Sequence, residues 1–124
     1  MSITSRIDNA KDLTVFTVTG VLSFDNAIPV VKAFYDGTPT KHVLWDLSDA
    51  SDVQFTSEEV KAIANFKPRY EGKRESGKTA FVAQEDILFG LSRMFELQSS
   101  ALKAPYHIMV FRDIDEACQW FDEP

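Results

Sequence analysis

The sequence predicts an α/β domain in which about four helices cover a mixed β-sheet of about five strands. Residues 3–19 have the pattern of an antiparallel hairpin, and apolar strand segments then alternate with amphipathic helical segments. Two of the expected helix starts also carry the residues of N-terminal capping boxes. Strands that alternate with helices imply parallel crossover connections and helices packed on the sheet faces.

The N-terminal hairpin is indicated by residues 13–19 (LTVFTVT), in which apolar and polar side chains alternate. This period of two is typical of a strand with one buried face. Residues 3–7 supply a partner strand, and residues 9–12 supply the turn between the two strands.

The first helix is expected to begin near Asp25 or Asn26, because Pro29 is tolerated only in the first helical turn. Its apolar face ends shortly before Gly37, which is a typical residue at the end of a helix.

The middle of the chain predicts a buried strand, a loop and a capped helix. Residues 41–47 (KHVLWDL) are mostly apolar and β-forming, and residues 48–54 read as a polar loop. Thr56 and Glu59 have the spacing of a capping box, and Pro68 stops the helix that follows.

The C-terminal half predicts two strand–helix units. Residues 79–83 form an apolar strand, and residues 86–102 form a long amphipathic helix. The last strand ends at residues 111–112. Asp113 then caps the final helix, with Glu116 in the reciprocal position.

The length and composition of the chain favour a single domain that spans residues 1–124. The single cysteine fits a reducing compartment. The net charge of −6 argues against nucleic-acid binding, which depends on cationic side chains. A single cysteine excludes an intrachain disulfide. We see neither a secretory signal nor a run of about 18 apolar residues that would span a membrane. We therefore expect a cytoplasmic protein.

No constellation of residues indicates an enzyme, a cofactor site or a metal site. Cys118 lies among acidic residues, which do not favour a thiolate nucleophile. His42 and His107 each begin a strand segment without a second ligand at metal spacing. We therefore expect no catalytic residue, no cofactor and no metal.

Asp46, Asp49 and Asp52 cluster within a short stretch, but their spacing lacks the glycine and the distal glutamate of a calcium loop. A solvated acidic loop is the favoured interpretation.

Phenylalanine is unusually frequent, with ten residues, and three of them suggest a ligand or interface surface. Phe24, Phe55 and Phe89 lie near helix starts at strand–helix connections, where ligands of open α/β sheets usually bind. Phe89 lies off the apolar stripe of its helix, and Gly90 beside it suggests that another group approaches closely. Met94, on the same helix, is the fifth residue that we expect at this ligand or interface surface. The alternative is that these are ordinary core residues.

Part of the C-terminal half closely resembles the SpoIIAA-like branch of the STAS superfamily. The resemblance is carried by residues 79–83 (TAFVA), 89–95 (FGLSRMF) and 110–113 (VFRD), and by Ala117 and Trp120. It covers about a third of the chain and implies a STAS-like fold for all of it.

In STAS antagonist domains a serine at a helix start is the phosphorylation switch, and it follows an aspartate. The corresponding region here, residues 52–59, lacks that pair but carries the hydroxyls of Thr56 and Ser57. The acidic side chains of Glu58 and Glu59 would repel a phosphate, so helix capping is the favoured role of Thr56.

The resemblance implies a non-catalytic signalling or protein-interaction module that binds a protein partner or a second copy of itself. Some relatives of this branch resemble lipid carriers with an apolar cavity. The alternative function is therefore a carrier or sensor of a small apolar ligand.

Overall fold

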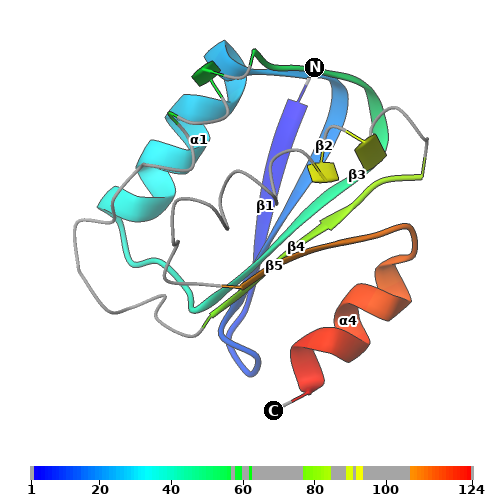
Figure 1. Cartoon of the computed structure of the whole chain (residues 1–124). Helices are drawn as coiled ribbons and strands as arrows, with labels where there is room; N and C mark the ends of the chain where they lie inside the picture. Colours follow the sequence, from blue (N-terminus) through cyan, green and yellow to red (C-terminus); the bar gives the residue numbers. More distant parts are fainter. Residues whose placement is uncertain are drawn as a thin grey trace.

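A five-stranded sheet in the order β1-β2-β3-β4-β5 forms the centre of the structure (Figure 1). The structure is a computed structural model, and it describes residues 2–56, 58–59, 62, 77–84, 89–90, 92–93 and 107–123. The strands are β1 (Ser2–Asp8), β2 (Leu13–Ser23), β3 (His42–Gln54), β4 (Lys78–Val82) and β5 (His107–Phe111). β1 is antiparallel to β2, and the other three pairs are parallel. The predicted mixed sheet is therefore confirmed.

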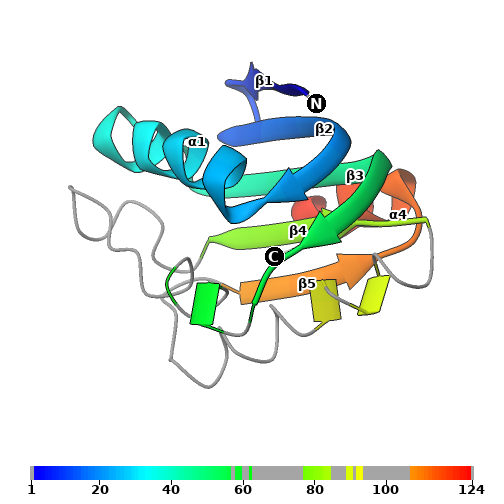
Figure 2. The same cartoon turned by 90° about the horizontal axis from the view of Figure 1, so that it is seen from above.

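Two helices are described along their whole length, α1 (Phe24–Asp36) and α4 (Ile114–Asp122). They lie on opposite sides of the sheet (Figures 1 and 2). Residues 58, 59, 62, 89, 90, 92 and 93 are also helical, and they fall within the segments predicted for two further helices. In the described part of the chain, no helix has both the length and the apolar character needed to cross a bilayer.

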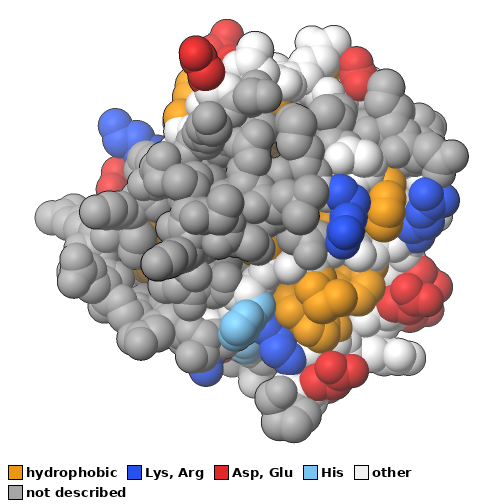
Figure 3. Space-filling model, in the orientation of Figure 1, with side chains coloured by type: hydrophobic (Ala, Val, Ile, Leu, Met, Phe, Trp, Pro, Cys, Tyr) orange, Lys and Arg blue, Asp and Glu red, His pale blue; other side chains and the backbone are white. Residues whose placement is uncertain are grey.

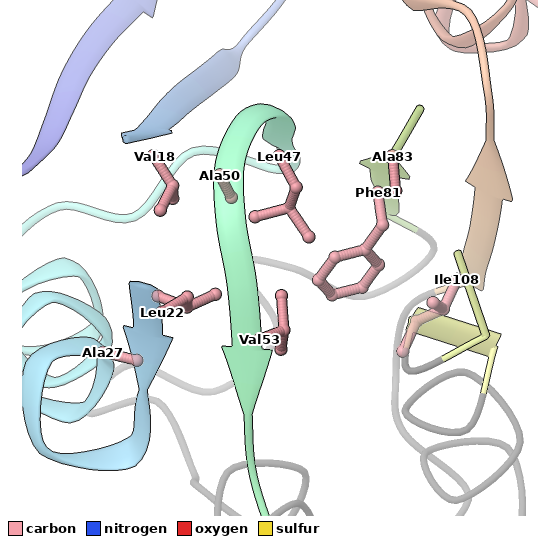
Figure 4. Packing of buried hydrophobic residues seen from close by; sticks show 9 residues of the cluster. All are labelled: Val18, Leu22, Ala27, Leu47, Ala50, Val53, Phe81, Ala83 and Ile108. Carbon is pink, nitrogen blue, oxygen red and sulfur yellow. The ribbon is translucent and has the colours of Figure 1, made fainter. Parts of the chain in front are cut away.

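The alternation of side chains along β3 and β4 divides the core into two clusters. We call them the α1-side cluster, shown in Figure 4, and the α4-side cluster. The α1-side cluster contains Val18, Leu22, Ala27, Leu47, Ala50, Val53, Phe81, Ala83 and Ile108. The α4-side cluster contains Leu13, Val15, Leu44, Ala80, Val82, Ala117 and Phe121. Each helix buries its apolar stripe against one face of the same sheet.

Strands β2 and β3 extend well beyond their predicted ends. The prediction of a polar loop at residues 48–54 was wrong, because this segment continues β3 and pairs with residues 19–23 of β2. The pairing passes two register shifts, and Gly20 lies between them with φ 79°. Only glycine adopts such a conformation without strain, so β2 bends there instead of ending. The extension buries Ala50 and Val53 in the α1-side cluster.

Helix α1 begins at Phe24, which is slightly earlier than predicted. Its N-cap is Ser23, whose amide donates to Oδ1 of Asn26 at 2.9 Å. The helix starts one or two residues before the position predicted near Asp25 or Asn26, so Pro29 lies in the second turn and not, as predicted, in the first. The predicted end is confirmed, since the amide of Gly37 donates to the carbonyl of Ala33 at 3.0 Å.

Helix α4 begins where its cap predicts. The carboxylate of Asp113 accepts a hydrogen bond from the amide of Asp115 at 2.8 Å. This bond satisfies one of the free amides of the first turn. Asp113, two residues after β5, therefore sets the point at which the chain turns back over the sheet.

Candidate functional site

The three phenylalanines singled out from the sequence lie near the carboxyl ends of the strands. β2, β3, β4 and β5 are parallel, so their carboxyl ends point toward the same side of the sheet. Phe24 directly follows β2 and Phe55 directly follows β3, while Phe89 belongs to the helical segment after β4. The last residues of β2 and β3, Ser23 and Gln54, are paired, so Phe24 and Phe55 leave the sheet at neighbouring points.

All three rings are half-buried, and two of them contact the core. Phe55 and Phe89 pack against the α1-side cluster, which also receives Phe81 from β4 and Ile108 from β5. The structure therefore brings Phe55 and Phe89 onto one cluster of residues. Their packing contributes to the fold, and a binding role for their exposed parts remains a prediction.

Arg112 is a neighbour of Phe89 that sequence reasoning did not select. It follows β5 directly, and its guanidinium carbon lies 4.6 Å from the centroid of the Phe89 ring. The side-chain amide of Gln84, which follows β4, donates to the backbone carbonyl of Arg112. A cation over an aromatic face is attracted by the ring quadrupole. The signal that could have identified Arg112 is its position at the carboxyl end of the last strand.

Gly90 is exposed, and a Cβ atom built there would meet no atom of the described residues within 4 Å. The close neighbour suggested by this glycine is therefore not found in the part of the chain that the structure describes. Met94 and Ser57 lie outside the described residues.

Thr56 caps the helix that follows it. Its hydroxyl accepts from the amide of Glu59 at 3.1 Å, and its own amide donates to Oε1 of Glu59 at 2.9 Å. These two reciprocal bonds form the capping box predicted from the sequence, which is confirmed. The Thr56 hydroxyl is exposed but serves as an acceptor in the cap.

The acidic residues around position 49 belong to strand β3, so the prediction of a solvated acidic loop was wrong. Oδ1 of Asp46 accepts from the amide and the hydroxyl of Ser48, at 3.0 and 2.6 Å. Asp52 accepts from the backbone amide of Val53 at 2.8 Å. Among the described residues, no three His, Cys, Asp or Glu side chains are grouped so that they could hold a metal ion.

The two histidines occupy different environments at the opposite end of the parallel strands. Nδ1 of His42 accepts from the backbone amide of Lys78 at 2.9 Å, which connects the start of β3 to the start of β4. His107 is exposed, and its backbone amide donates to the carbonyl of Gly77 at 2.8 Å. The bond to His42 gives its imidazole a role in holding the sheet together.

Comparison with known proteins identifies the fold. The sequence matches no protein-family model and none of the curated proteins. An anti-sigma factor antagonist from Mycobacterium paratuberculosis is similar in structure, with a TM-score of 0.62, 16% identity and coverage of 98% of this chain and 96% of that chain. The chain has a SpoIIAA-like fold.

Two further structures share this SpoIIAA-like fold. One is an uncharacterized protein from Shewanella loihica PV-4, with a TM-score of 0.56 and 16% identity over 96% of this chain and 93% of that one. The other is the anti-sigma factor antagonist SpoIIAA in its unphosphorylated form, with a TM-score of 0.50 and 9% identity over 96% of each chain. The STAS-like fold implied by the sequence resemblance is therefore confirmed.

Proposed function

We propose that this SpoIIAA-like domain is a non-catalytic signalling module that acts by binding a protein partner. The proposal is carried by its likeness, over nearly the whole chain, to two structures named as anti-sigma factor antagonists. An antagonist of this kind acts on another protein.

The bonding of its polar side chains supports a non-catalytic role. The His42 imidazole accepts from a backbone amide, Asp46 accepts from Ser48, and the Thr56 hydroxyl caps a helix. In His42 this bond occupies the lone pair of Nδ1 that a catalytic base would need. Each of these groups instead stabilises the chain around it.

The proposed contact surface lies at the carboxyl ends of the parallel strands. Its described part comprises the exposed parts of Phe24, Phe55 and Phe89, together with Gly90, and it extends to Arg112. Half-buried aromatic rings next to an arginine are typical anchors of protein interfaces. The capping role of Thr56 argues against a phosphate switch at that hydroxyl, and the nearby Glu58 is exposed.

No observation favours the alternative function, a carrier of a small apolar ligand. The rings of Phe55 and Phe89, which were expected to belong to a ligand or interface surface, pack against the α1-side cluster.

The test is purification of the tagged chain from the cells that produce it, followed by native mass spectrometry and quantitative proteomics. We expect one protein partner in near-stoichiometric amount. Arg112→Glu should reduce its recovery, whereas the matched control Arg6→Glu, on the exposed edge strand β1, should not. Recovery of the chain with a bound small apolar molecule and no protein partner would refute the proposal.

A further inference from the structure

Strand β1 forms an edge of the sheet that can accept a further strand. Among the described residues it pairs only with β2, and Figure 2 shows it at the margin of the molecule. Alternate residues of an edge strand direct their N–H and C=O groups away from the sheet. A proline or a bulge often protects such an edge, but residues 2–8 contain no proline and their pairing with β2 has no register shift.

The edge strand also carries an uncovered apolar side chain. Ile7 is 59% exposed, the largest fraction among the exposed large hydrophobic residues that the structure describes. Ile3 packs against the α1-side cluster, and Ile7 lies on the same face of β1 because residues four positions apart in a strand share a face. The residue paired with Ile7 on β2 is Thr14, whose hydroxyl is hydrogen-bonded to that of Thr40 at 2.8 Å. Ile7 therefore faces a polar side chain across β2.

The β1 edge is electrically neutral in an acidic chain. β1 and β2 together contain two charged residues, Arg6 and Asp8, whose charges cancel, whereas the whole chain carries −6. On the face of the molecule seen in Figure 3, by contrast, several acidic and basic side chains surround the apolar ones. Copies of an acidic protein repel each other least where the contact itself carries no net charge. The β1 edge is therefore suited to a contact between two copies of this chain.

The sequence of β1 matches itself when two copies pair antiparallel about a two-fold axis at Ser5. Each Ile7 then lies opposite Ile3 of the other copy, so the exposed isoleucine gains an apolar cross-strand partner. No two like charges are directly opposite each other. The opposed pairs in this register are Ser2–Asp8, Ile3–Ile7, Thr4–Arg6 and Ser5–Ser5.

The other two-fold registers of β1 are less favourable. An axis at Thr4 brings neither isoleucine opposite the other, and an axis at Arg6 places that charge against its own copy. An axis at either isoleucine joins only three residues of each strand. In the register about Ser5, the two copies of Arg6 lie diagonal to each other. Asp8, two residues along the same face of the strand, offsets their charge.

We propose that this chain forms a two-fold symmetric dimer in which the β1 strands of two copies pair antiparallel about Ser5. The contact joins two five-stranded sheets and occupies the β1 edge of each copy, so the assembly closes at two copies. The inference goes beyond the proposed function, because β1 does not belong to the surface at the carboxyl ends of the parallel strands. Since β2 would run in opposite directions in the two copies, the dimer would present these two surfaces at opposite ends.

Sedimentation equilibrium measures the association. One pair of seven-residue strands is a small interface, so we expect a dissociation constant of about 10–100 µM. The average mass should rise from that of one chain at about 1 µM toward that of two chains at about 500 µM. Unfolding measurements at about 1 µM would therefore report on the single chain.

A disulfide tests the register. Directly opposed residues of antiparallel strands have Cα atoms about 4.5–5.5 Å apart, which a disulfide can span. In a Cys118→Ser background, which removes the native thiol, Ser5→Cys should give a disulfide-linked dimer in a glutathione buffer. Met109→Cys, 41% exposed on the opposite edge strand β5, is the matched control and should remain largely unlinked.

A second pair of variants tests the isoleucine contact. Ile7→Thr keeps a β-branched residue in the strand but removes apolar area, and it should raise the dissociation constant of the dimer by about tenfold. Met109→Thr makes a comparable change on β5 and should alter the constant by less than about twofold. Both positions are exposed, so both variants should keep the fold, which circular dichroism checks.

A monomer over the whole concentration range, a dimer unaffected by Ile7→Thr, or equal linking through Ser5→Cys and Met109→Cys would overturn the proposal. Growth beyond two copies would also contradict it, because the β1 contact closes. A monomeric chain that loses a protein partner on Ile7→Thr would show that the edge takes a strand of another protein. A monomeric chain that still recovers its partner would refute the dimer and leave the proposed function intact.

Discussion

At the scale of single residues, Phe89 contributes to the core and also to the surface. Its ring packs against the α1-side cluster on one side and lies under the Arg112 guanidinium on another. The sequence showed only that this aromatic lies off the apolar stripe of its helix. The structure adds that the neighbouring strands supply the groups that cover it.

We predict that Phe89→Ala lowers the free energy of unfolding by about 2 kcal/mol, because a half-buried ring contributes less than a fully buried one. Urea denaturation measures the change. Ile7→Ala, at an exposed position, is the control and should have little effect. An unchanged stability for Phe89→Ala would mean that the ring serves only the surface.

At the scale of elements, helix α4 depends on a lysine from a distant strand. No basic residue lies in its last turn. Instead, Lys78 of β4 donates from Nζ to the carbonyls of Trp120 and Glu123, at 2.5 and 2.6 Å. The ammonium also lies 5.3 Å from the centroid of the Trp120 ring. A cation bound to the last carbonyls of a helix satisfies free acceptors and interacts favourably with the helix dipole.

We predict that Lys78→Met lowers the free energy of unfolding by about 1–2 kcal/mol, because it removes charge-assisted hydrogen bonds at a partly exposed site. The variant should also exchange its α4 amide hydrogens faster than the wild type does, with a smaller change at the amides of the central strands. Lys32→Met, on the exposed side of α1, is the matched control. Unaltered exchange in α4 would show that its position is set by Ala117 and Phe121 alone.

At the scale of the whole molecule, the two core clusters share strand β3. Leu47 belongs to the α1-side cluster and Leu44 to the α4-side cluster, and both are almost completely buried. Trp45 packs against the first cluster and Trp120 against the second. A strand common to both clusters couples the stabilities of the two sides of the sheet.

We predict that the described sheet and its two clusters unfold in one transition. Leu44→Ala and Leu47→Ala should each lower the free energy of unfolding by about 2–5 kcal/mol. Trp120→Phe leaves Trp45 as the fluorescent probe of one side, and Trp45→Phe leaves Trp120 for the other. Each leucine variant should shift the midpoints of both probes equally. A shift confined to the probe on the mutated side would contradict a single cooperative unit.

The sequence alone determined the features that depend on near neighbours. The hairpin follows from a two-residue alternation, and the caps at Thr56 and Asp113 join residues within three positions of each other. The mixed sheet followed from the alternation of such elements and from the resemblance to SpoIIAA-like domains. The candidate site could be predicted only as a set of positions at the carboxyl ends of strands.

The tertiary structure decided the features that depend on distant partners. Residues 48–54 have the polar composition of a loop, yet they form a strand because the bent end of β2 pairs with them. The cover of Phe89 comes from Arg112, and the C-terminal cap of α4 comes from Lys78. Hydrogen bonds and burial supplied by distant segments outweigh the weak local preferences of residues for helix, strand or loop. Local sequence patterns do not show which distant segment will supply them.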